Sequence, residues 1–337
     1  MLSLDITNAS EAHRFAYFTP LNDTYANANP NSYSFDGPRS ILTRLSTATA
    51  SLGQVLPINH NFVNSSYSIQ FLGPYVNCYE ANSTVEEIMD AFLQNMNVTL
   101  QENSQYLVDA YYAFVPSFDA NVDGATTIFI NGRNYTALDQ PRMQQQPGNT
   151  TNELWMKFHR YLTDSNGNYI LDANGNKLQQ PMYSICSLCN ASYDLQFSFE
   201  NGVQSIQNKS SRLLNPVDYP INNPNESSDL VQLSYSAVFW VFADQMVGFM
   251  GIIMDSVTGT PEYGSIDTNI EHNSLLGSND LDYYFYINSE AFGSISTTLS
   301  DQRLLDKALA QNQTLPFLAQ QVSFNMTMSL MNDPLLA

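Results

Sequence analysis

Hydrophobic and polar residues alternate with a period of two in two segments of the chain, 64–71 and 190–199. In the first segment, Tyr67, Ile69 and Phe71 alternate with serine and glutamine. The second segment begins 126 residues later and repeats this order with tyrosine, leucine and phenylalanine. A period of two is typical of a strand with one buried face, so we expect two half-buried strands whose aromatic side chains point inward.

Each of these segments has a cysteine close by, Cys78 after the first and Cys186 before the second. The strands are equivalent elements of two related halves, or they are sheet neighbours joined by a disulfide between Cys78 and Cys186. The residues alone leave both interpretations open. A third is that the two segments resemble each other by chance.

Apolar residues at intervals of three and four predict helices. Ser83 and Glu86 have the spacing of a capping box. The apolar run 282–287 predicts a strand or a buried segment. The expected helices cover the segments 38–45, 83–96, 235–254, 300–310 and 315–330.

Segment 235–254 is long and apolar enough to resemble a membrane span. However, Asp244 and Gln245 lie at its middle, where a carboxylate is costly inside a membrane. The glycosylation signals at Asn225 and Asn312 lie on either side of it and need the same lumenal side, which a single crossing does not allow. We therefore expect a buried helix.

Turn signals separate several short strands. Asn131-Gly132 and Asn201-Gly202 each follow a β-prone run and predict hairpins. Segment 155–162 predicts a strand. Two Asp-x-Asn-Gly-Asn sequences, which begin at Asp164 and Asp172, predict the tight turns of a β-meander.

These patterns predict an α+β fold, mainly an antiparallel β-sheet or sandwich with several packed helices. The polar segment 145–151 is the best linker candidate. It divides the chain into an N-terminal half, 1–145, and a C-terminal half, 146–337. The two halves are related, or the whole chain is a single compact domain.

Composition narrows the class of partner. Only 13% of the residues are charged, and 12 Lys and Arg stand against 32 Asp and Glu, which gives a net charge of −20. Such a surface repels phosphate backbones and anionic lipid headgroups, so nucleic-acid binding is excluded as the main function.

The glycosylation signal Asn-x-Ser/Thr is over-represented. A random order of the 36 Asn and 56 Ser and Thr residues would give roughly 6 such sequons, whereas the chain has twelve. The excess favours a glycoprotein of the secretory pathway. The twelve are Asn8, Asn22, Asn64, Asn82, Asn97, Asn134, Asn149, Asn190, Asn208, Asn225, Asn312 and Asn325.

Three cysteines are too few for a disulfide scaffold. In an oxidising compartment we expect one long-range bridge and one spare thiol. Cys186 and Cys189 form a C-x-x-C sequence, but its flanks predict strand rather than the helix N-terminus of a redox site.

The best metal-site candidate is the sequence Asp-Ala-Asn-Val-Asp-Gly. Asp119, Asn121 and Asp123 supply oxygen ligands at intervals of two, as in a calcium loop. The twelfth position is Ile130, where such a loop has a bidentate glutamate. An ordinary Asp- and Asn-rich turn is therefore the simpler interpretation, and calcium is the one cofactor that the sequence suggests.

The sequence contains no nucleophile, phosphate-loop or zinc motif. Carboxylates are numerous, so a glycosidase-like pair is a further hypothesis. Glu153, Asp244 and Asp255 lie in apolar surroundings, in which burial raises the pKa of a carboxyl group. Capped or helix-edge carboxylates without a catalytic role are the alternative.

The run Asn-Ser-Ser-Tyr-Ser-Ile-Gln-Phe-Leu-Gly-Pro-Tyr-Val-Asn-Cys at 64–78 resembles a signature of a family of large, uncharacterised fungal multi-pass membrane glycoproteins. Other features of the chain resemble features of that family and follow one another in the same order as in the family. Together they cover most of residues 38–335. They are the helix at 40–50, the sequence Cys-x-Leu-x-Asn-Ala-Ser at 186–192, the helix that begins with Tyr235, and Asn-Met-Thr at 325–327.

This resemblance implies an extracytoplasmic domain set between transmembrane helices that lie outside this chain. It assigns no catalytic residue. Cys78 and Cys186 match the family pattern, whereas Cys189 departs from it, which leaves the pairing of Cys189 open. The chain begins without the basic and apolar regions of a signal peptide, so we expect a piece of a longer protein.

Our first functional hypothesis is a non-enzymatic, heavily glycosylated extracellular domain of a fungal membrane protein. It would serve surface sensing, adhesion or contact with a cell-wall polysaccharide or a surface protein. The alternatives are a secreted or surface glycan hydrolase with a carboxylate pair, and a calcium-stabilised adhesion module.

Overall fold

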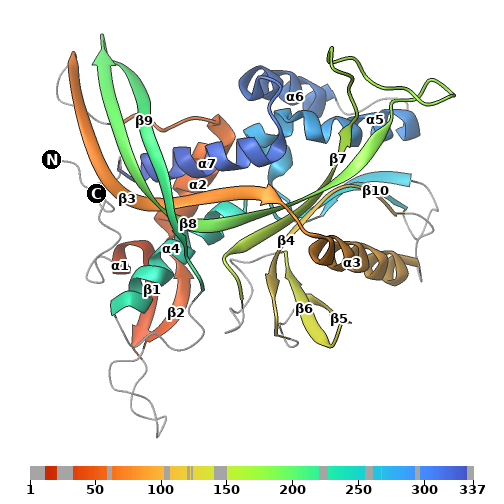
Figure 1. Cartoon of the computed structure of the whole chain (residues 1–337), viewed down its shortest axis with the longest axis horizontal. Helices are drawn as coiled ribbons and strands as arrows, with labels where there is room; N and C mark the ends of the chain where they lie inside the picture. Colours follow the sequence, from red (N-terminus) through yellow and green to blue (C-terminus); the bar gives the residue numbers. More distant parts are fainter. Residues whose placement is uncertain are drawn as a thin grey trace, which may run out of the picture.

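Figure 1 shows the computed structural model of the chain. The structure describes residues 12–20, 33–58, 63–101, 107–119, 122, 124–139, 150–219, 227–254, 261–266, 268–292 and 297–331. It confirms the α+β class, because helices pack on one nine-stranded sheet, and a separate two-stranded sheet lies beside it. Every strand pair in the described part is antiparallel.

The helices are α1 Ala12–Phe15, α2 Ser40–Leu52, α3 Ser83–Gln101, α4 Ser227–Ala243, α5 Asp282–Phe292, α6 Thr297–Ala310 and α7 Leu315–Leu330. The strands are β1 Ala16–Pro20, β2 Tyr33–Pro38, β3 Ser65–Glu80, β4 Leu107–Ser117, β5 Thr126–Ile130, β6 Arg133–Leu138, β7 Glu153–Tyr161, β8 Gln179–Glu200, β9 Val203–Pro216, β10 Gly248–Met254 and β11 Pro261–Ile266. Three 3₁₀ turns lie between β11 and α5: η2 Ile270–His272, η3 Ser274–Gly277 and η4 Asn279–Leu281.

The main sheet has the strand order β11-β10-β4-β7-β8-β3, with β9 beside β8 and the β5-β6 hairpin beside β4. It therefore takes strands from both sides of the 145–151 segment. The two alternating strands of the sequence are β3 and part of β8, and they are antiparallel neighbours. Tyr67 faces Phe197 and Phe71 faces Tyr193, with stacked rings 5.3 Å and 5.0 Å apart.

Two hydrophobic cores lie on opposite faces of the sheet. Tyr112 and Phe114 of β4 join the core under α3, whereas Ala113 and Val115 join the larger core formed with α2, α4, α5 and α7. Figure 1 shows α3 on one side of the sheet and α5 and α7 on the other. Strand β7 is covered on both faces, which explains why its residues are buried almost without alternation.

Helix α7 covers the free edge of β3, the last strand in the sheet order. Polar side chains on one face of the helix bond to the backbone of the strand, as a neighbouring strand would. The contacts join the Cys78 amide to Gln320 Oε1 (3.2 Å), the Val76 amide to Ser323 Oγ (3.0 Å) and Thr327 Oγ1 to the Pro74 carbonyl oxygen (2.8 Å).

The expected helix over 235–254 is wrong in its second half. Helix α4 ends at Ala243, and β10 begins at Gly248. The chain turns at Asp244 and Gln245, whose carbonyl oxygens accept hydrogen bonds from two asparagine side chains. Both elements are buried all round, so apolar composition did not reveal the boundary. Among the described helices, none has the length and apolar character that a membrane crossing needs.

Two further expectations need correction. Of the two alternatives for segment 282–287, the strand is wrong, because the segment begins α5; Tyr284, Phe285 and Ile287 are buried, whereas Tyr286 is exposed. The cap of α3 is Asn82, whose Oδ1 accepts from the amide of Val85 (3.1 Å), in place of the expected Ser83.

The turns agree with the sequence pattern. Asn131 and Asn201 begin their hairpin turns with positive φ, each followed by a glycine with positive φ. Asp164 accepts hydrogen bonds from the amides two and four residues later, and Asp172 makes the same two contacts. The two Asp-x-Asn-Gly-Asn sequences therefore form the same turn. Hydrogen bonds from these turns lower the pKa of both carboxyl groups.

Candidate functional site: a cleft beside β8

A cleft opens where β8 changes its hydrogen-bonded neighbour. Glu153 at the start of β7 pairs with Ser187, whereas Pro216 at the end of β9 pairs with Cys189. Between these two pairs, the Leu188 amide donates to the Asn152 carbonyl oxygen, and the Leu188 carbonyl oxygen accepts from the Val217 amide. Strands β7 and β9 therefore lie end to end along the same edge of β8, and the cleft beside this junction has a volume of about 470 Å³.

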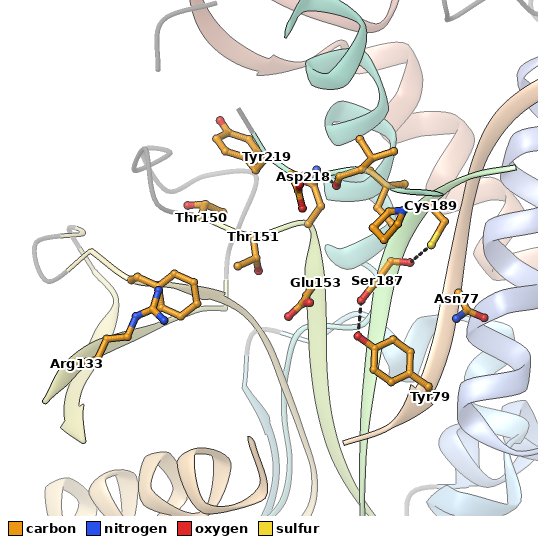
Figure 2. A pocket seen from close by; sticks show the side chains of 15 residues that line it. Asn77, Tyr79, Arg133, Thr150, Thr151, Glu153, Ser187, Cys189, Asp218 and Tyr219 are labelled. Carbon is orange, nitrogen blue, oxygen red and sulfur yellow. Dashed lines mark hydrogen bonds between the residues drawn. The ribbon is translucent and has the colours of Figure 1, made fainter. Parts of the chain in front are cut away.

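The described residues that line the cleft come from five strands, β3, β6, β7, β8 and β9, and from three connecting segments. Figure 2 shows Glu153 between Arg133 on one side and the pair Tyr79 and Ser187 on the other. Asp218, in the segment after β9, contributes a second carboxylate.

The charged groups of the cleft are held without ion pairs. Glu153 Oε2 accepts from Trp155 Nε1 (2.9 Å), which lies on the same face of β7. The Arg133 guanidinium lies 3.5 Å from the centre of the Phe118 ring. Among the described residues, neither Arg133 nor Glu153 nor Asp218 forms an ion pair.

Within the described part of the chain, two buried polar atoms of residues that line the cleft have no hydrogen-bond partner. Thr150 is 6% exposed, and its Oγ1 is unpartnered. Asn152 is 5% exposed; its Nδ2 donates to Val217 (3.0 Å) and Ser236 (2.9 Å), but its Oδ1 accepts nothing. Buried polar groups in native proteins are nearly always paired, so these atoms are the feature of the cleft that most needs explanation.

The predicted disulfide is confirmed and lies behind the cleft. Cys78 and Cys186 face each other in the β3–β8 register and form a bridge in the larger core. The residues that follow them, Tyr79 and Ser187, point to the opposite face and share a hydrogen bond of 3.0 Å. The bridge therefore fixes the strand pair that presents one wall of the cleft.

Cys189 lines the cleft as a buried free thiol. Burial raises the pKa of this thiol, which disfavours the reactive thiolate. Cys186 is bonded to Cys78, so the C-x-x-C sequence is not a redox pair in this fold.

The calcium-loop candidate is described only in part. Asp119 follows β4, and its amide donates a hydrogen bond to Ser117 Oγ (3.3 Å). Asn121 and Asp123 lie outside the described residues. Within the described residues, no group of three or more His, Cys, Asp or Glu side chains is arranged to hold a metal ion.

The sequons differ in exposure. Asn325 is 6% exposed inside α7, and its Nδ2 donates to the Gly53 carbonyl oxygen (3.1 Å). Asn134 and Asn190 are half-buried. The exposed asparagines are Asn64, Asn82, Asn208 and Asn312. The remaining sites, with the side chain of Asn97, lie outside the described residues: Asn8, Asn22, Asn149 and Asn225.

A second polar cluster lies under α3. Lys157 Nζ is 3.0 Å from carboxylate oxygens of Asp90 and Asp109, and His159 Nε2 is 3.0 Å from Asp109. Tyr183 donates to Asp90 (2.8 Å). Burial raises the pKa of Asp109, but the hydrogen bond from His159 and the charge of Lys157 outweigh burial and hold the pKa at about 2.

This shift predicts a pH-dependent stability. Because the pKa of folded Asp109 is about 2 against an ordinary 3.8, its ionised form stabilises the fold by about 2 kcal/mol above pH 4. The contribution is lost as the pH falls from about 4 through 2. Urea unfolding of the wild type and of Asp109→Asn should therefore show a difference in free energy that shrinks over this range. Asp301→Asn, at an exposed position on α6, is the control. A constant difference would contradict the assignment.

Sequence reasoning found Glu153 and the two bridged cysteines but missed most of the cleft. Thr150, Asn152 and Asp218 carry no motif, and each reaches the cleft through the pairing of β8 with β7 and β9. Of the other carboxylates that the sequence singled out, Asp244 is buried after α4, and Asp255 lies outside the described residues.

No protein-family model, curated protein or solved structure matches the chain.

Proposed function

We propose that the chain is the N-glycosylated, extracellular domain of a fungal membrane protein, tethered by segments outside it, and that it binds a ligand in the cleft beside β8. The observation that carries the proposal is the Cys78–Cys186 bridge, because structural disulfides persist in oxidising compartments. The four exposed sequons support it as well. Surface sensing, adhesion and wall contact are the roles that such a domain would serve.

Glycan occupancy tests this proposal residue by residue. After expression in a eukaryotic secretory host, we expect glycans on the exposed asparagines and none on Asn325, since its amide is packed against Gly53. Peptide mapping by mass spectrometry before and after deglycosylation, without reduction, measures occupancy and the disulfide together.

Two variants sharpen the measurement. Asn208→Gln should lower the mass by one glycan without loss of stability, because Asn208 is exposed on β9. Asn325→Gln should leave the mass unchanged and lower the melting temperature. A protein that is secreted without glycans, or whose Cys78 and Cys186 are reduced, would contradict the proposal.

A glycan hydrolase is the second candidate, and one observation favours it. Glu153 and Asp218 bring two carboxylates to the same cleft, which is the chemical requirement of most glycosidases. Release of shorter saccharides by the purified protein would favour this function over binding alone.

A further inference from the structure

We infer that the cleft beside β8 binds a neutral saccharide. This inference rests on the proposed function, since it names the class of ligand that the extracellular domain would meet.

The unpaired atoms require a ligand that both donates and accepts hydrogen bonds. Asn152 Oδ1 accepts only, whereas Thr150 Oγ1 does both. Glu153 has acceptor capacity beyond its bond from Trp155. A sugar hydroxyl group both donates and accepts, so it matches the hydrogen-bonding needs of each of these three groups. Binding would then supply the partners that the cleft lacks, which is how a site built for hydroxyl groups gains selectivity.

The charges select against anionic ligands. Among the described residues that line the cleft, Arg133 is the one basic side chain, and Glu153 and Asp218 are the two acidic ones. The whole chain carries a net charge of −20, which repels phosphorylated or uronic-acid ligands at long range. A neutral ligand can use the carboxylates as acceptors and the guanidinium as a donor without this repulsion.

The ends of the cleft offer apolar surface to the flat face of a sugar. Tyr79 is 45% exposed at one end, and Arg133 stacks on Phe118 at the other, with Glu153 between them (Figure 2). Pockets of this kind combine ring surfaces with a few fixed polar groups.

Both tryptophans of the chain report on this cleft. Trp155 donates to Glu153, and Trp240 stacks on Tyr219, whose ring centre is 5.8 Å away. A ligand that engages Glu153 or Tyr219 should therefore change the intrinsic fluorescence.

The experiment titrates the purified, deglycosylated protein with laminaritriose, mannotriose and triacetylchitotriose, with trigalacturonic acid as the anionic probe. We expect a saturable change of tryptophan fluorescence with at least one neutral trisaccharide below about 10 mM, and none with the anionic one. The trisaccharide should be recovered intact by chromatography.

Thr150→Val is the decisive variant. It removes an unpaired buried hydroxyl, so we expect an equal or higher melting temperature together with at least tenfold weaker binding. The change keeps the sequon Asn149-x-Thr151, so glycosylation is untouched. Thr126→Val, at an exposed position of β5, is the matched control and should bind as the wild type does. Glu153→Gln should also weaken binding, against Glu200→Gln as its control.

Three outcomes would overturn the inference: no saturable change with any neutral trisaccharide, unchanged binding in Thr150→Val, or preferential binding of the anionic probe. If the glycosylated and disulfide-bonded protein binds none of the sugars, the inference fails while the proposed extracellular location stands. If a reduced, unglycosylated protein still binds the sugars, the proposed extracellular location fails while the inference stands.

Discussion

Replacement of both Cys78 and Cys186 by serine lowers the free energy of unfolding by about 4 kcal/mol. The bridge closes a loop of 108 residues, and a cross-link of this length removes much chain entropy from the unfolded state. Urea unfolding followed by circular dichroism measures the loss. We also expect weaker saccharide binding, because the bridge aligns the strands that present Tyr79 and Ser187.

Cys189→Ser is the matched control for the bridge. Cys189 is buried but free, so its replacement by serine should cost about 1 kcal/mol and leave the unfolding curve sensitive to reductant. If the wild-type protein unfolds at the same urea concentration with and without reductant, the bridge contributes no stability and this prediction is wrong.

Asp280→Ala should destabilise the fold by about 3 kcal/mol. Asp280 is 1% exposed and accepts two hydrogen bonds from Arg160, from Nε (2.6 Å) and Nη2 (3.0 Å). It also accepts from the amide of Leu315 (2.7 Å), the first residue of α7. One carboxylate thus joins β7 to the start of α7, and its removal leaves a guanidinium and a helix N-terminus without their partner.

Thermal unfolding measures the effect of Asp280→Ala against Asp301→Ala. Asp301 is exposed on α6, so the same truncation there should change stability by less than about 0.5 kcal/mol. Equal losses in the two variants would show that the buried contacts of Asp280 do not stabilise the fold.

The sequence predicted best those strands that have one face buried and the other exposed to solvent. In β3 and β8, Tyr67 and Tyr193 alternate with polar residues because only one side of this strand pair is covered, and the period of two survives. The prediction failed at a boundary between two elements that are both buried. The end of α4 and the start of β10 share one apolar run, so tertiary packing rather than periodicity decides between helix and strand.

The cleft could not be predicted for a different reason. Its walls come from positions as distant as Tyr79, Arg133 and Asp218, and they meet only because β8 is long enough to pair with β7 and then with β9. Glu153 was recognisable as a carboxylate in apolar surroundings. Thr150 and Asn152 become notable only when their missing hydrogen bonds are seen.

The cover that α7 gives to β3 has a consequence for biosynthesis. Strand β3 ends at Glu80, whereas its two neighbours in space, β8 and α7, leave the ribosome much later. At roughly 5–20 residues per second, β8 follows after roughly 5–25 s and α7 after roughly 10–50 s, so the two edges of the nascent strand are covered at different times. Cys78 can join Cys186 only once β8 has emerged, and the other edge of β3 stays uncovered until α7 follows, so an unpaired strand edge is exposed throughout this interval.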